Sequence, residues 1–86
     1  MKLEEIRNII DQIDSKILKL LNERMEQALL ANKFKKAIED TAREKEILEK
    51  IKHTPNLLLE PSFTEPLYKL IISWSKELQG RNYQVV

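Results

Sequence analysis

Three basic side chains stand at positions where this 86-residue sequence otherwise places hydrophobic residues on a helical face. Arg24 and Lys35 continue the register of a long amphipathic segment, and Arg43 falls on the apolar face of the next one. Arg24 and Lys35 are eleven residues apart, about three helical turns, so their side chains point the same way. Cations that face inward are costly to bury unless an anion balances them. We expect a ligand with two carboxylates, because guanidinium groups bind carboxylates in a bidentate manner.

A simpler explanation of these basic residues competes with the ligand. Long basic side chains can lie along an apolar stripe and extend their charged ends into water, or the stripe can end near residue 21. That explanation suffices for a single basic residue. For several cations in register, the anion-binding interpretation is favoured.

The composition excludes most other catalytic devices. The chain has no cysteine and one histidine, His53, which removes thiol nucleophiles, disulfides and histidine-paired catalysis. We expect His53 to be solvated at the end of a helix. The sequence contains no metal-ligand spacing, no glycine-rich phosphate loop and no nucleophile–base pair. A formal net charge of +1, from 15 basic and 14 acidic residues, argues against a general nucleic-acid or membrane-surface binder.

Three further polar residues are candidates for the same site. Glu44 follows Thr41 with the spacing of a capping box, so its carboxylate either reaches back to the first amides of a helix or serves the site. Ser75 and Gln79 are one turn apart beside an apolar face. Solvent exposure is the ordinary explanation for both, and the alternative is a buried amide that donates or accepts hydrogen bonds in a pocket.

Arg7 can belong to such a site only if two chains build it. It precedes Arg24 by seventeen residues, which on one helix is roughly 25 Å along the axis and about 100° around it. The two side chains of one chain therefore cannot meet on a small ligand, and a partner protomer would have to supply Arg7. On pattern alone, an ordinary exposed arginine near a helix start is the favoured explanation.

The elements that must position these residues are predicted to be three helices in a single domain over residues 1–86, with no strands. Hydrophobic residues at alternating spacings of three and four predict a first helix over about residues 3–36. Trp74 is expected in the core. The second helix is expected to begin with a cap at Asp40 or Thr41, and a loop is expected over 53–63. The third helix is expected to begin with a cap at Ser62 or Thr64, to have Pro66 in its first turn and to end at Gly80. Residues 81–86 are expected to form a tail.

The first helix is too long for the rest of the chain to cover. A helix of that length extends roughly 50 Å, well beyond the size of a globule of 86 residues. A second copy of the chain is the simplest cover for its apolar stripe, which predicts an intertwined homodimeric helical bundle.

Membrane and secreted locations are not expected. The longest stretch without a charged residue, residues 53–59, has seven residues and cannot span a bilayer. We therefore expect a soluble, cytoplasmic protein with neither a membrane nor a nucleic acid as a partner.

In order and spacing, several of these residues resemble the all-α chorismate mutase family. The pattern covers about residues 3–79 and comprises Leu3-x-x-Ile6-Arg7-x-x-Ile10-Asp11-x-x-Asp14, Leu20-Leu21-x-x-Arg24, Lys35, Asp40-x-x-Arg43-Glu44 and Ser75-x-x-x-Gln79. The resemblance implies an intertwined dimer of three-helix chains that converts chorismate to prephenate without a cofactor. It also implies that Arg24, together with Arg7 of the other chain, grips the two carboxylates of chorismate, and that Arg43 and Ser75 assist there.

At the other end of the substrate, the resemblance implies roles for the remaining candidates. Lys35 and Gln79 would hydrogen-bond the ether oxygen whose bond breaks, and Glu44 would hold the ring hydroxyl near the Asp40 backbone. One feature departs from the family: the connection between Lys35 and Asp40 is shorter than expected and lacks glycine and proline, which can displace Asp40, Arg43 and Glu44 from the pocket.

Two other functions remain open from the sequence. Isochorismate–pyruvate lyases share the fold and the basic residues, and Phe34 and Trp74 have similar surroundings there, whereas Glu44 as a hydroxyl holder favours the mutase. The third possibility is a helical dimerisation or ligand-sensing module without catalysis.

Overall fold

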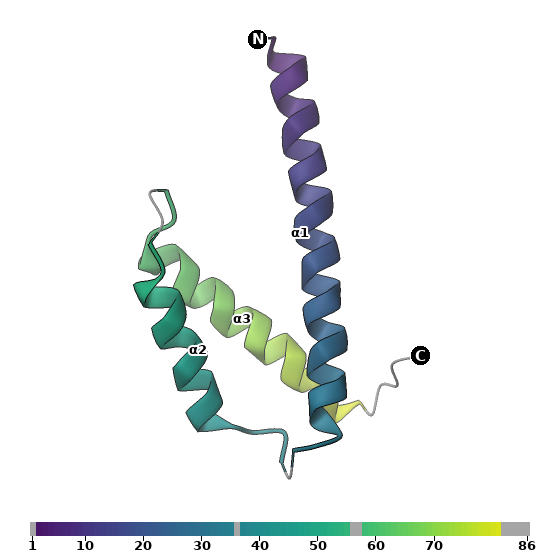
Figure 1. Cartoon of the computed structure of the whole chain (residues 1–86), viewed down its shortest axis with the longest axis vertical. Helices are drawn as coiled ribbons and strands as arrows, with labels where there is room; N and C mark the ends of the chain where they lie inside the picture. The colour runs from purple at the N-terminus through teal and green to yellow at the C-terminus, as the bar shows by residue number, and fades with distance from the viewer. Residues whose placement is uncertain (1, 36, 56–57, 82–86) are drawn as a thin grey trace.

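The computed structural model of the chain describes residues 2–35, 37–55 and 58–81, which form three α-helices (Figure 1). They are α1 (Leu3–Asn32), α2 (Thr41–His53) and α3 (Pro61–Gly80), and the described residues contain no strand. The predicted all-α, three-helix class is confirmed, and Gly80 ends α3 as predicted.

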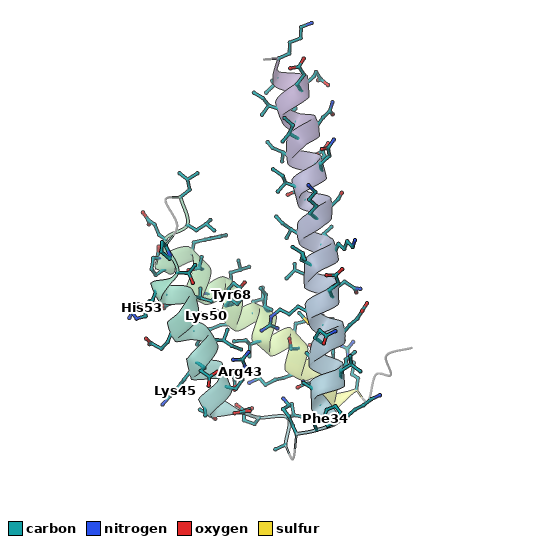
Figure 2. All side chains as sticks on the ribbon, in the orientation of Figure 1. Phe34, Arg43, Lys45, Lys50, His53 and Tyr68 are labelled. Atoms are coloured by element: carbon teal, nitrogen blue, oxygen red, sulfur yellow. The ribbon has the colours of Figure 1, made fainter. Side chains whose placement is uncertain are left out.

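α1 ends earlier than its apolar pattern predicts. The prediction that this helix reaches about residue 36 is wrong, because α1 ends at Asn32. The backbone N–H of Lys33 donates to the carbonyl three residues before it (3.1 Å), which tightens and closes the last turn. Phe34, which follows, is 88% exposed (Figure 2), so no apolar contact favours a further turn. Lys35 therefore lies in the connection to α2 and not on the helix.

α2 begins where the sequence predicts. Asp40 precedes its first residue, and Oδ1 of Asp40 accepts a hydrogen bond from the backbone N–H of Arg43 (3.1 Å). His53 is its last residue and is exposed, as expected, with its Nε2 3.2 Å from a carboxylate oxygen of Glu49. The loop after α2 is shorter than expected because α3 already starts at Pro61.

α3 starts with a proline at its first position. Its N-cap residue is Glu60, so the prediction of a cap at Ser62 or Thr64 is wrong. Proline is favoured at the first helical position because its missing N–H would have no intrahelical partner there. Pro66 is therefore the sixth residue of α3 and lies beyond the first turn in which it was expected.

α3 is the central helix and packs against both α1 and α2. Its buried face carries the hydrophobic residues Ile71 and Ile72 and three polar residues, Thr64, Ser75 and Gln79. Only the C-terminal part of α1 lies beside α3, and the N-terminal half of α1 extends away from both other helices (Figure 1). Polar side chains are thus buried where α1 meets α3, and hydrophobic ones are exposed where α1 stands alone.

The projecting half of α1 carries an uncovered apolar stripe. Every described side chain from residue 2 to residue 20 is exposed (Figure 2). Trp74 of α3 is also 43% exposed, with the Arg81 guanidinium 5.1 Å from its ring centroid, so its expected place in the core is wrong for a single chain. The large hydrophobic residues exposed along this part of α1 include Ile6, Ile9, Ile10, Ile13, Ile17 and Leu20.

None of the helices in the described residues combines the length and the hydropathy that crossing a membrane requires.

Candidate active site

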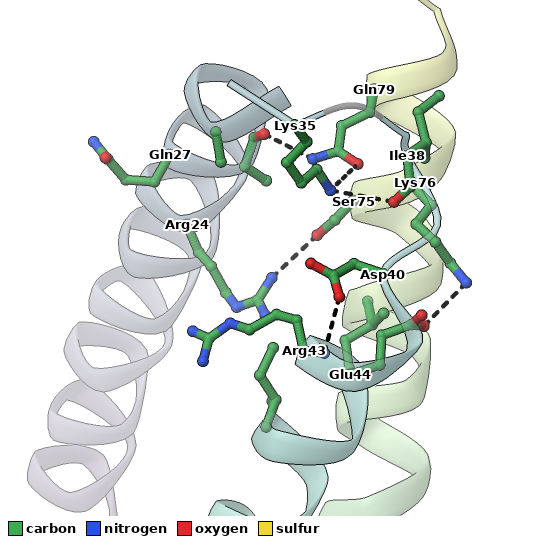
Figure 3. A pocket seen from close by; sticks show the side chains of 14 residues that line it. Arg24, Gln27, Lys35, Ile38, Asp40, Arg43, Glu44, Ser75, Lys76 and Gln79 are labelled. Atoms are coloured by element: carbon green, nitrogen blue, oxygen red, sulfur yellow. Dashed lines mark hydrogen bonds and ion pairs between the residues drawn. The ribbon is translucent and has the colours of Figure 1, made fainter. Parts of the chain in front are cut away.

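A pocket of about 300 Å³ lies between the C-terminal part of α1, the connection after it, the start of α2 and the second half of α3. Lys35 and Gln79 lie together at one end, Arg24 extends into the pocket from α1, and Arg43 of α2 lies at its rim (Figure 3). Seven of the eight residues predicted for the site line it: Arg24, Lys35, Asp40, Arg43, Glu44, Ser75 and Gln79. The eighth, Arg7, does not.

Arg24 is held in the pocket by a buried hydroxyl group. Its Nη1 donates to Oγ of Ser75 (3.1 Å), and Ser75 in turn donates to the backbone carbonyl of Ile71 (2.9 Å). The sulfur of Met25 also lies 3.2 Å from this hydroxyl. Ser75 is only 7% exposed, so solvent exposure does not explain it. These contacts orient the guanidinium and leave its other N–H groups available to a carboxylate.

Lys35 and Gln79 form a pair of donors at the other end of the pocket. Nζ of Lys35 donates to the carbonyl of Ile38 (3.2 Å) and to Oε1 of Gln79 (3.4 Å), while Nε2 of Gln79 donates to the carbonyl of Ala28 (2.7 Å). Gln79 is 4% exposed, so its amide is buried beside a cation. The ammonium has three N–H bonds and the amide two. Each group therefore keeps a hydrogen for a ligand atom placed between them.

The short connection before α2 does not remove that helix from the site. Asp40, Arg43 and Glu44 all line the pocket despite the shortened connection. Arg43 lies at the rim, because its side chain is 62% exposed and its Nη1 forms an ion pair with Glu46 (2.7 Å). The hydrogen bond from the Arg43 backbone N–H to Asp40 fixes the start of α2, from which Arg43 and Glu44 project.

Glu44 lines the pocket and does not form a capping box. Because Asp40 is the N-cap residue, Glu44 is the fourth residue of α2 and is out of register for a box, which uses the third. Its Oε1 instead accepts a hydrogen bond from Nζ of Lys76 (3.0 Å). This hydrogen bond is the largest cause of a pKa of Lys76 above its ordinary value, opposed by partial burial and reinforced by Glu39.

Lys76 is a pocket residue that the sequence analysis missed. The signal was its spacing: it adjoins Ser75 and lies three residues before Gln79, on the same side of α3. A lysine in that place is ordinarily solvated, and nothing in the local pattern revealed its carboxylate partners. Ile38, Ile47 and Ile72 also line the pocket and supply an apolar wall.

The charges of the pocket favour a dianionic ligand. Arg24 and Lys35 hydrogen-bond only to neutral acceptors within the described part of the chain, so no carboxylate there neutralises either cation. Lys76 is paired with Glu44, and Arg43 with Glu46 outside the pocket. The described residues also contain no cluster of metal-ligating side chains. The cationic lining residues are Arg24, Lys35, Arg43 and Lys76, and the acidic ones are Asp40 and Glu44.

Arg7 lies on the exposed N-terminal half of α1. The helix is continuous from Leu3 to Asn32, so Arg7 is roughly 25 Å along the axis from Arg24 of its own chain. Its own chain therefore cannot bring it to the pocket, and its contribution from a second chain stays a prediction.

Comparison with known proteins identifies the family. The family described as chorismate mutase type II matches residues 6–80, which include all the pocket residues and the bounds of α2 and α3. No curated protein and no solved structure matches the chain. With a family match over most of its length and the helical fold that this family has, the chain belongs to the chorismate mutase type II family.

Proposed function

We propose that this protein is a chorismate mutase that catalyses the Claisen rearrangement of chorismate to prephenate, a step of phenylalanine and tyrosine biosynthesis. The observation that carries the proposal is the pair formed by Lys35 and Gln79, two donors directed into a pocket whose cations Arg24 and Lys35 lack a carboxylate partner in the described residues. Membership of the family supports the same reaction.

The reaction needs only what the pocket contains. In chorismate the ether carbon–oxygen bond breaks while a new carbon–carbon bond forms in the same molecule, so no proton, nucleophile or cofactor takes part. The protein has two tasks: to hold the side chain of the substrate folded over the ring, and to stabilise negative charge that grows on the ether oxygen. Fixed cations and a neutral amide perform both tasks without changing their own protonation.

The carboxylate-binding role is assigned to the arginine end of the pocket. Arg24 offers N–H groups that Ser75 holds in place, and Arg43 adds a second guanidinium from the rim. Bidentate contacts with the carboxylates would restrain the substrate, and this restraint supplies much of the entropic part of the rate enhancement.

The donors at the opposite end act on the breaking bond. The ammonium of Lys35 and the amide of Gln79 would each donate their remaining hydrogen to the ether oxygen. Such donors stabilise the transition state more than the substrate, because the oxygen becomes more negative as its bond lengthens. Glu44 would accept a hydrogen bond from the ring hydroxyl, beside the Asp40 backbone.

A homodimer with shared sites completes the proposal. The apolar stripe on the N-terminal half of α1 has no cover within the described chain, and a second copy offers the complementary surface at its own α1 and α3. In an antiparallel arrangement the exposed half of α1 reaches the pocket of the partner. Arg7 would then approach the same ligand as Arg24 of the other chain.

The closest competing activity is that of an isochorismate–pyruvate lyase. A fixed carboxylate at Glu44 favours the mutase, since it gives the hydroxyl of chorismate a defined acceptor. The test is incubation of the purified protein with chorismate and, separately, with isochorismate, followed by chromatography of the products. We expect prephenate from chorismate. Salicylate and pyruvate from isochorismate alone would indicate the lyase, and binding without any product would indicate a ligand-sensing module.

A further inference from the structure

Lys76 occupies one side of the pocket, and the proposed chemistry leaves it without a role. It projects from α3, between Ser75 and Gln79 in sequence, and its ammonium lies on the far side of Glu44 from the arginines (Figure 3). Its Nζ donates to Oε1 of Glu44 (3.0 Å) and to both carboxylate oxygens of Glu39 (3.3 and 3.4 Å). The residue therefore joins three elements of the fold: α3, α2 and the connection that precedes α2.

We infer that Lys76 is the positioning residue of Glu44: its hydrogen bond to Oε1 holds the carboxylate so that the second oxygen, Oε2, accepts a hydrogen bond from the ligand. The inference rests on the proposed function for the identity of that ligand. It does not make Lys76 a catalytic residue, because its contact is with Glu44 and not with the substrate.

The two carboxylates bound by Lys76 differ in burial, and this difference assigns the role. The side chain of Glu44 is 22% exposed and that of Lys76 31%, whereas that of Glu39 is 66% exposed. A hydrogen-bonded ion pair is stronger where water is partly excluded, and an exposed pair contributes little. Lys76 therefore acts mainly on Glu44, and Glu39 is a weak second partner on the solvent side.

The hydrogen-bond inventory of Glu44 supports the same role. Oε1 is occupied by Lys76, and Oε2 makes no hydrogen bond to the described residues. A carboxylate held at one oxygen has fewer rotamers, and its other oxygen is directed by that contact. An ionised Glu44 can only accept, so the ligand must present a donor such as a hydroxyl at this side of the pocket.

Without Lys76, Glu44 would lack its nearest cation. The charged groups that share the pocket with it are Asp40 of the connection, Arg43 of its own helix, Arg24 of α1 and Lys35. Asp40 is a like charge one turn away, and Arg43 is paired with Glu46 on the exposed side. Removal of Lys76 is therefore expected to free the side chain of Glu44 from its one ion pair within the described residues.

The first experiment measures steady-state kinetics with chorismate for a set of variants. Lys76→Met keeps the aliphatic stem but removes the ammonium, and we expect kcat/KM to fall about tenfold or more. Lys76→Arg restores a cationic donor and should recover most of that loss. Glu39→Gln is the matched control: it removes the exposed partner of Lys76, lies outside the pocket lining, and should change kcat/KM by less than about twofold.

A double variant separates positioning from a general structural effect. If Lys76 acts through Glu44, Lys76→Met should cost little further activity once Glu44→Gln has been introduced. Circular dichroism shows whether each variant keeps its helices. Equal losses from Lys76→Met in both backgrounds, or full activity in a folded Lys76→Met, would overturn the inference.

A second measurement does not need enzymatic activity. Carbon-13 NMR relaxation of the Glu44 side chain in the free protein reports how firmly the carboxylate is held. Its order parameter should be lower in Lys76→Met than in the unmodified chain and unchanged in Glu39→Gln. The other four charged groups of the pocket are the same in both proteins, so the difference reports on Lys76. An unchanged order parameter in Lys76→Met overturns the inference. Absence of mutase activity in the unmodified chain refutes the proposed function, while the order parameter still decides the role of Lys76.

Discussion

Replacement of Lys35 by alanine is expected to lower kcat for chorismate by about 10²–10³-fold, while KM rises much less. The reason is that the ammonium is proposed to act on the ether oxygen, whose charge is greatest in the transition state. A group that binds the transition state more tightly than the substrate changes kcat when it is lost, whereas a group that binds both equally changes KM.

The magnitude follows from the hydrogen bonds of Lys35. Its two contacts, with the carbonyl of Ile38 (3.2 Å) and with Oε1 of Gln79 (3.4 Å), are long and made to neutral acceptors, so their loss costs the fold little. The third N–H is the donor that catalysis loses, and one such donor contributes roughly 3–4 kcal/mol to the barrier. In Lys35→Ala, Gln79 keeps its 2.7 Å hydrogen bond to the carbonyl of Ala28, so its amide can still donate to the ether oxygen of the substrate. The expected fall in kcat therefore corresponds to the loss of about one donor.

The assay follows loss of chorismate at several concentrations for Lys35→Ala and for a matched control, Lys33→Ala. Lys33 is exposed, lies two residues away and does not line the pocket, so its removal changes the charge of the segment without touching the site. We expect unchanged kinetics for the control. A folded Lys35→Ala with unchanged kcat, or an equal loss in Lys33→Ala, would refute the proposed action on the ether oxygen.

Four further results are expected. Gln79→Glu should be active mainly at acidic pH, where its protonated carboxyl still donates to the ether oxygen, and a flat kcat–pH profile would show that the side chain does not contact that oxygen. Ser75→Ala removes the 3.1 Å acceptor that orients Arg24, so KM should rise about tenfold, and an unchanged KM in steady-state kinetics would contradict that role. If two chains associate, Tm from calorimetry should increase with protein concentration, and a constant Tm would contradict a dimer. The hydrogen bond to Glu44 raises the pKa of Lys76 above its ordinary value of 10.5, so the stability that its charge adds is fully present below pH 10.5 and is lost as the pH rises through the folded pKa. Urea titrations should therefore show that the free energy of unfolding of the unmodified chain exceeds that of Lys76→Met by less as the pH passes that value. A difference that stays constant with pH would contradict the ion pair.

Three cations of the site, Arg24, Lys35 and Arg43, could be predicted because each interrupts an apolar helical pattern. Arg24 occupies a helical position that otherwise faces the core, and the structure places it in the pocket. Lys35 was predicted on the wrong basis: it lies beyond the end of α1, yet the chain after Asn32 still directs its ammonium to Gln79. A periodic pattern thus identified the right residue although the helix that was to carry it ends three residues earlier.

Other features depend on contacts that no local pattern contains. Lys76 was missed because its partner Glu44 is 32 residues away in sequence, and only packing of α2 against α3 brings them together. The start of α3 was misplaced because the proline at its first position outweighed the capping preference of Ser62 and Thr64. Trp74 has the hydrophobicity of a core residue, but the described residues leave it 43% exposed, and its sequence neighbours do not reveal that.

The central claim is that two chains build each site, and a complementation experiment tests it most directly. Arg7→Ala and Arg24→Ala should each give a folded, nearly inactive dimer, since each lacks a charge-assisted carboxylate contact at both sites. The two variants are then unfolded, mixed in equal amounts and refolded. One variant carries an isotope label, so native mass spectrometry of the mixture distinguishes mixed dimers from parent dimers by mass and measures their fraction.

Random pairing makes about half of the dimers mixed, and each mixed dimer has one doubly damaged site and one intact site. Chorismate mutase activity should therefore recover to roughly a quarter of the level of the unmodified protein, from two preparations that had almost none. Each variant refolded alone is the control and should recover nothing. A mixture that stays as inactive as its parents, although mixed dimers have formed, would contradict the claim that Arg7 and Arg24 serve one ligand across the interface.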